Sequence, residues 1–241
     1  MIKIENVETF GWETAIRGMR NPMNSWDKSD SEFNVSTYWD DECTMEYEHY
    51  DVIIGNNDLK LMKKLSRAGN DHGKFLRMIN VTIDIVAPLY WWKEFDTYKV
   101  GTVANSCSTM HKIQEKEFTL DDFSHEHLLD LGALCSSTSS LKLLISKLNF
   151  WRNRHNESDE ERTKYFNYNG YPSVPTKKEC WWQMIQLLPS SYNQRRTVQL
   201  NYAVLKNIYH SRKNHKLDEW LEFCKWVESL PYSRELIVGD N

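Results

Sequence analysis

The chain has 241 residues, a formal net charge of −4, and 40% hydrophobic and 13% aromatic residues. This length suits one large domain or two small ones, and the ten Trp residues can supply a sizeable core. No excess of positive charge favours duplex DNA or RNA as a partner. The sequence has no run of about 18 apolar residues, no apolar secretion signal and no CxxC pair among its five cysteines. We therefore expect a reduced cytoplasmic protein with no membrane span and no metal site.

The first 86 residues predict two short helices and a strand. Residues 14–20 and 58–67 have apolar residues at helical spacing, and Asn57 suits the N-cap of the second helix. Residues 75–86 alternate apolar and polar side chains with the period of a β-strand. Because a lone strand leaves backbone groups unsatisfied, further strands are expected in residues 1–55.

The rest of the chain predicts mostly helices. Pro88 suits the first turn of a helix, and Thr119 to Asp122 resembles a capping box. Asn153 to Lys178 predicts a long surface loop, and the tail from Pro231 is expected to be irregular. Further helices are predicted near residues 125–134, 139–152, 179–188, 197–212 and 216–230.

Small polar side chains gather between Thr102 and Thr109. They let a ligand approach the backbone closely, and they offer donors and acceptors suited to a nucleotide base or phosphate. A thiolate at Cys107 could add to C6 of a pyrimidine. The alternative, to which we give more weight, is that Cys107 is a small, half-buried replacement for Ser that takes no part in chemistry.

The predicted helix 197–212 carries a polar residue at each end of an apolar stripe. Eleven residues bring a helix back to within about 20° of its starting direction. Asn201 and Arg212 would therefore lie on one stripe, presenting an amide to one ligand and a guanidinium to a phosphate. The alternative, favoured by spacing alone, is that Arg212 only complements the helix dipole.

These motifs resemble the flavin-dependent thymidylate synthase family over roughly residues 56–112 and 187–225. The last helix of that family has an Asn, a second Asn six residues on and an Arg eleven residues on, and Asn201, Asn207 and Arg212 match them. Leu188-Pro189 also matches in spacing. The resemblance implies an α+β fold, with helices packed on an antiparallel sheet, for residues 1–241 as a single domain. It also implies a homotetramer with active sites between subunits.

The family signature, Arg-His-Arg followed after seven residues by Ser, is matched in spacing more than in identity. Thr97-Tyr98-Lys99 stands for Arg-His-Arg, and Cys107 stands for Ser. Glu94 takes the place of a Gln. Further family ligands are also replaced. Ala203 stands where the family has a flavin-binding Arg, and Arg77-Met78 stands where it has Glu-His. Ile185 stands where the family has a dUMP-binding Arg, for which Arg195 or Arg196 could substitute. Weaker matches in the N-terminal region are Arg17, Arg20 and Ser25.

The resemblance implies reductive methylation of dUMP, or of a related pyrimidine nucleotide, using methylene-tetrahydrofolate, FAD and NADPH. It implies that Asn201 and Asn207 contact the flavin, with Lys99 as a further candidate, and that Arg212 contacts the dUMP. Our candidate catalytic residues are Arg212 and, from the chemistry of its thiol, Cys107. The nucleotide would be bound by Glu94, Asn105, Ser106, Cys107, Ser108 and Arg212. A second hypothesis is a catalytically altered homologue that binds or sequesters nucleotides, and a third is another C5 modification of a pyrimidine.

Overall fold

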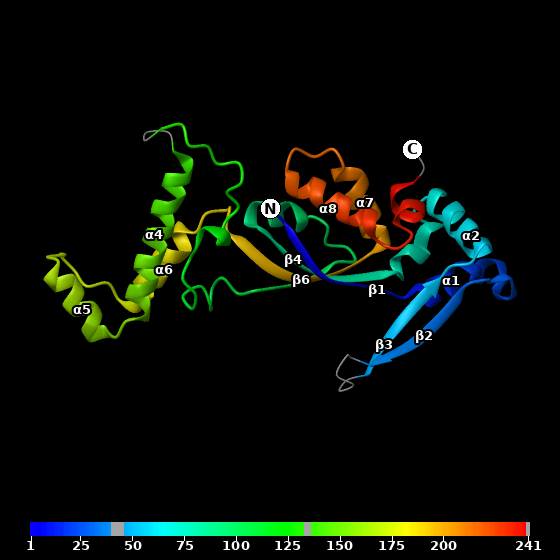
Figure 1. The fold of residues 1–241 in the computed structure, drawn as a ribbon, viewed down its shortest axis with the longest axis horizontal. Coiled ribbons are helices and arrows are strands. Elements are labelled where there is room, and N and C mark those ends of the chain that lie inside the picture. Colours follow the sequence, from blue (N-terminus) through cyan, green and yellow to red (C-terminus); the bar gives the residue numbers. More distant parts are fainter. Residues whose placement is uncertain (40–45, 133–135, 240–241) are drawn as a thin grey trace. The chain divides into compact units, whose positions relative to one another are not determined.

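The computed structural model describes residues 1–39, 46–132 and 136–239 (Figure 1). The chain divides into two compact units. Unit 1 comprises Met1–Lys3, Ile85–Thr97 and Asn105–Arg196, and unit 2 comprises Ile4–Asp84, Tyr98–Ala104 and Thr197–Asn241. Four strands form one sheet in the order β1 (Lys3–Phe10), β4 (Asn80–Pro88), β6 (Asn193–Asn201) and β5 (Val103–Ser106). The expected α+β class, with helices and antiparallel sheet, is confirmed.

The strands expected near the N-terminus are present. Besides β1, an antiparallel hairpin pairs β2 (Glu32–Trp39) with β3 (Glu46–Ile53). Strand β4 has the predicted alternation, because Val81, Ile83 and Ile85 are buried and the residues between them are partly exposed. The predicted start of this strand at residue 75 was wrong. Phe75 and Leu76 are buried in a 3-10 helix, η3 (Gly73–Arg77), before the strand begins.

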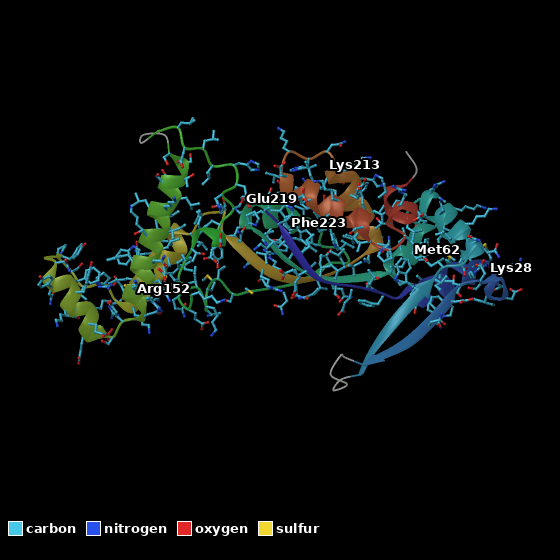
Figure 2. All side chains as sticks on the ribbon, in the orientation of Figure 1. Lys28, Met62, Arg152, Lys213, Glu219 and Phe223 are labelled. Atoms are coloured by element: carbon cyan, nitrogen blue, oxygen red, sulfur yellow. The ribbon has the colours of Figure 1, made fainter. Side chains whose placement is uncertain are left out.

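Helix α7 lies at the centre of the helices of unit 2. Helix α7 (Tyr202–Arg212) contacts η3, α8 (Asp218–Ser229) and a π-helical turn, η5 (Arg234–Val238). The tail is therefore ordered here, contrary to the expectation of an irregular segment. Helices α1 (Trp12–Arg20) and α2 (Asn56–Arg67) complete the unit, together with the short turns η1 (Asn21–Met23) and η2 (Trp26–Lys28). Figure 2 labels Met62 on α2 and Phe223 on α8, and both side chains are fully buried.

Two predicted helix starts in unit 2 were wrong. Residues 197–201 belong to strand β6 rather than to the first turn of the predicted helix 197–212, because Val198 and Leu200 are buried while Thr197 and Gln199 are exposed. Helix α2 is not capped by Asn57. The Asp30 carboxylate instead accepts hydrogen bonds from the backbone amides of Asn57 and Asp58.

Unit 1 contains α3 (Leu89–Phe95), η4 (Leu120–Asp122), α4 (Ser137–Asn156), α5 (Asp159–Tyr168) and α6 (Lys177–Leu187). The predicted helix after Pro88 and the Thr119 capping box are confirmed. The predicted loop 153–178 was wrong, since α4 extends into it and α5 begins at a Ser158–Glu161 capping box. Residues 125–132 are not helical, and 133–135 lie outside the described residues.

Helices α4 and α6 pack together around an apolar core. The core includes Ile145, Leu148 and Met184, and it extends to Phe118 and Phe123 beside η4. In the part of the chain that the structure describes, no helix is both long and apolar enough to cross a bilayer.

Candidate functional site

A cavity of about 590 Å³ lies in unit 2 against α7, and we call it the α7 cavity. Its volume is in the range of sites that hold small molecules and cofactors. The lining comes from the end of α2, η3, the turn at residues 100–101 and α7. The lining residues with most bearing on ligand binding are Arg77, Gly101, Asn201, Lys206, Asn207 and His210.

The α7 cavity brings together the two Asn residues that the resemblance assigned to the flavin, but their environments differ. Asn201 is buried and is the N-cap of α7, where its Oδ1 accepts a hydrogen bond of 3.1 Å from the Val204 amide. Its Nδ2 donates to the Gly101 carbonyl at 3.5 Å. Asn207 is exposed, and no described residue hydrogen-bonds to its side chain. Asn207 thus offers a complete amide to a ligand, whereas much of the Asn201 amide already serves the fold.

Gly101 allows the chain to pass close to Asn201. Its φ of +78° lies in the left-handed region that favours glycine. A Cβ at this position would lie 2.7 Å from Nδ2 of Asn201. Sequence reasoning did not single out Gly101, although a glycine directly before a polar segment is a signal for close backbone approach.

Cationic side chains also line the α7 cavity. The Lys206 Nζ donates to the carbonyl and the hydroxyl oxygen of Ser66, both at 2.7 Å. Burial lowers the pKa of Lys206, and the nearby charge of Arg67 lowers this pKa further. His210 and Arg77 add ring nitrogens and a guanidinium to the lining.

Sequence reasoning missed Lys206 and His210. The signal was available, because Ala203, Lys206, Asn207 and His210 have the spacing of one helix face.

Arg212 lies outside the lining of the α7 cavity and is held by aromatic rings. Its Nε donates to the Tyr98 hydroxyl at 2.9 Å. Its guanidinium carbon lies 4.8 Å from the ring centroid of Trp220 and 5.7 Å from that of Tyr98. The neighbouring Lys99 is exposed and does not line the α7 cavity either. Tyr98, in the signature position, therefore packs against Arg212.

A second cavity, of about 290 Å³, lies in unit 1 and is lined by Cys107 and Ser108; we call it the Cys107 cavity. The Cys107 amide donates to the Arg195 carbonyl at 2.9 Å, and its carbonyl accepts from Nε2 of Gln194 at 3.0 Å. The Cys107 side chain is exposed, whereas the sequence analysis expected a half-buried residue.

The residues just before Cys107 form an edge strand rather than a loop. Asn105 and Ser106 lie on β5, are exposed, and do not line the Cys107 cavity. Glu94 lies partly buried on α3, where its carbonyl accepts a hydrogen bond from Thr97.

The two candidate substitute arginines have different environments. Arg196 forms an ion pair with Asp96 at 2.7 Å, and its guanidinium carbon lies 4.2 Å from the ring centroid of Trp92. Arg195 lines the Cys107 cavity and is exposed. Arg195 is therefore the better placed of the two to meet an anion in that cavity.

Arg20 and Ser25, matched near the N-terminus, belong to a buried polar network instead of a cavity wall. The Arg20 Nε contacts the fully buried Asp58 carboxylate at 2.6 Å, and its Nη1 donates to the Ser25 carbonyl at 3.0 Å. Burial raises the pKa of Asp58, but hydrogen bonds from Ser29, Ser31 and Arg20 outweigh this and hold it below the ordinary value. This network joins α1, α2 and the start of β2.

Across the described residues, no group of three or more His, Cys, Asp or Glu side chains is arranged to hold a metal ion. No family model matches the sequence, and no curated protein matches it significantly.

Solved structures of similar fold do exist. Thymidylate synthase X from Helicobacter pylori, crystallised with FAD and dUMP, superposes with a TM-score of 0.61 at 13% identity, over 98% of this chain and 97% of that one. A second structure of the flavin-dependent enzyme from Helicobacter pylori, complexed with FAD and dUMP, gives 0.58 at 13% identity, over 97% and 98%. The chain therefore has the fold of these flavin-dependent thymidylate synthases along almost its whole length.

Proposed function

We propose that this chain is a divergent flavin-dependent thymidylate synthase that converts dUMP, or a related pyrimidine nucleotide, to its methylated product. The observation that carries the proposal is the joint position of Asn201 and Asn207 in one cavity of a fold shared with structures that bind FAD and dUMP. Methylene-tetrahydrofolate would supply the one-carbon unit and NADPH the electrons. The proposal includes a single functional domain, a cytoplasmic location and a homotetramer.

The α7 cavity has the donors that a flavin nucleotide needs. Asn207 offers an amide to the ring carbonyl and nitrogen atoms, and Lys206 and Arg77 offer positive charge to the diphosphate. The missing Cβ of Gly101 lets the backbone at this residue lie against the Asn201 side chain, and both residues line the cavity. FAD, when bound, supplies the hydride chemistry, and the protein residues bind and orient it.

The pyrimidine nucleotide would use the remaining candidate residues. Cys107, Ser108 and Arg195 line the Cys107 cavity, where hydroxyl and guanidinium groups suit a phosphate. Arg212 is a further proposed phosphate ligand, and its Nε donates to the Tyr98 hydroxyl. Glu94, Asn105, Ser106 and Lys99 remain proposed ligands whose roles depend on the bound state.

The second candidate is a nucleotide-binding protein without catalysis. It is favoured by Thr97-Tyr98-Lys99, which replaces the Arg-His-Arg of the family signature. Tyr98 accepts a hydrogen bond from Arg212, and Lys99 lacks the planar fork of an arginine. Loss of these cations weakens the attraction for a dianionic cofactor.

The visible absorption spectrum of the purified protein, alone and after mixing with FAD and gel filtration, separates the two candidates. A flavin band that elutes with the protein and weakens in Asn207→Ala supports the synthase and leads to an assay of dUMP methylation. A third class, another pyrimidine C5 modification, would also retain flavin but yield a different product. A protein that fails to retain FAD and still binds dUMP supports the second candidate.

A further inference from the structure

The charged side chains that line the α7 cavity are all basic. Among the described residues of its lining, Arg77 and Lys206 are cationic, His210 can take up a proton, and none is Asp or Glu. The whole chain has a net charge of −4, so this excess of positive charge is local to the cavity. Such a lining favours a ligand that carries negative charge.

The Lys206 ammonium is held by a single neighbour, Ser66. An ammonium has three hydrogens to donate. Lys206 donates to the carbonyl and to the hydroxyl oxygen of Ser66, each at 2.7 Å. Its third hydrogen has no acceptor among the described residues and is left for a ligand. Burial and the nearby charge of Arg67 lower the pKa of Lys206, so a bound anion would stabilise the charged form.

Ser66 is itself oriented by the C-terminal turn η5. The Ser66 hydroxyl donates to the Leu236 carbonyl at 2.8 Å. Because a carbonyl oxygen can only accept, the single hydroxyl hydrogen lies on this bond, and the Ser66 oxygen is left to accept from Lys206. The hydrogen bonds therefore run in one direction, from the Lys206 ammonium through the Ser66 hydroxyl to the turn.

The turn η5 can fix these bonds because its own side chains are buried. Leu236 and Ile237 are buried where η5 packs against α2, α7 and α8. The Gly239 amide closes the turn on the Arg234 carbonyl at 3.0 Å. A second side chain of the cavity lining is tied to the same turn, since Nε2 of His210 lies 2.9 Å from the Ile237 carbonyl. The C-terminal turn thus holds two lining residues, one directly and one through Ser66.

We propose that Ser66 and the turn η5 are positioning elements of the α7 cavity, which hold the Lys206 ammonium ready for the phosphate groups of a bound ligand. The identification of these phosphates as the diphosphate of a flavin nucleotide rests on the proposed function. A lysine side chain is flexible, so fixing it before the ligand arrives removes an entropy cost that corresponds to about two- to tenfold in affinity. In this arrangement Ser66 acts through Lys206.

A double-mutant cycle tests the positioning role, with isothermal titration calorimetry of inorganic pyrophosphate as the readout. The variants are Ser66→Ala, Lys206→Met and the double variant. We expect Lys206→Met to weaken pyrophosphate binding about tenfold and Ser66→Ala to weaken it about threefold. In the Lys206→Met background, Ser66→Ala should change the affinity by less than about 1.5-fold, because the group that it positions is gone. An equal loss in both backgrounds would show a structural role and overturn the proposal, as would a wild type that fails to bind pyrophosphate.

Ser233→Ala is the matched control, because it makes the same substitution at the residue directly before η5. The Ser233 side chain is buried like that of Ser66, but its hydroxyl has no hydrogen-bond partner among the described residues. We expect this variant to bind pyrophosphate as the wild type does, and a loss like that of Ser66→Ala would overturn the proposal.

Retention of FAD, read in the same samples, tests the proposed function separately. A wild type that binds pyrophosphate and gives the expected cycle, but retains no FAD, would refute the proposed function and leave the positioning role of Ser66 intact. A wild type that retains FAD but shows equal losses in the two backgrounds would do the reverse.

Discussion

The two Asn residues of the α7 cavity should respond differently to removal of their amides. Asn201→Ala deletes the N-cap acceptor of α7 and the contact with Gly101. Loss of an N-cap costs about 1–2 kcal/mol of the unfolding free energy, which corresponds to about 2–8 °C in Tm for a chain of this size. Asn207→Ala removes an exposed side chain without a described partner, so its effect on stability should stay within about 0.5 kcal/mol.

Thermal unfolding and FAD titration measured on the same samples check this division. We expect Asn207→Ala to weaken FAD binding about tenfold at unchanged Tm, because one amide makes about one to two hydrogen bonds to the ligand. Asn201→Asp is the matched control for Asn201→Ala, since it keeps the cap acceptor and places negative charge at the helix N-terminus. A Tm of Asn201→Ala equal to that of the wild type, or an equal loss of Tm in Asn207→Ala, would refute the assignment.

Four further predictions concern single residues. Gly101→Ala should lower both Tm and FAD affinity, measured as above, because its Cβ would lie 2.7 Å from Asn201. Arg212→Ala should weaken dUMP binding more than tenfold by calorimetry, and unchanged affinity would remove Arg212 from the site. Cys107→Ser should keep its turnover within a few-fold, whereas a loss above a hundredfold would indicate a covalent role. Because the pKa of Asp58 is lowered in the folded state, its stabilising effect is present above the unfolded pKa of 3.8 and is lost as pH falls through the lower folded value. Acid unfolding of Asp58→Asn should therefore show a weaker pH dependence than that of the wild type.

The sequence predicted the structure well where one spacing of apolar residues dominated a segment. Strand β4 and helix α3 were predicted because alternating Ile and Val residues end at a proline that can begin a helix. Residues 197–201 were misassigned because Val198 and Leu200 fit both a strand and a helix within so short a run. Only pairing within the sheet decides between them, and the pairing partners are distant in sequence.

The α5 region shows a different reason for failure. Its sequence is charged and ends in Asn, Gly, Tyr and Pro, which is typical of a loop. The helix forms because Ser158 and Glu161 cap each other and because the buried Arg162 donates to the Pro175 carbonyl at 2.8 Å. The capping box is visible in the sequence, but the contact with Pro175 is tertiary and has no local pattern.

The candidate site could be predicted only in part from the sequence. The family resemblance identified Asn207, which lines the α7 cavity, whereas Lys206 and His210 on the same helix face were missed. Spacing cannot show that Asn201 serves as a cap, because that depends on where the helix begins. Nor does it show that Gly101, 100 residues earlier in the sequence, would lie beside it.

The replaced signature residues bear most directly on the choice between a synthase and a binding protein. Where the family has His, this chain has Tyr98, whose hydroxyl accepts a hydrogen bond from Arg212 and whose ring lies beside the guanidinium. An arginine held in this way loses little further side-chain entropy when an anion binds it. Tyr98 thus adds no positive charge of its own at this position, and it holds the guanidinium of Arg212 in place. If catalysis is retained, Tyr98→Phe should raise the KM for dUMP more than it lowers kcat; a loss confined to kcat would contradict this view of the loop.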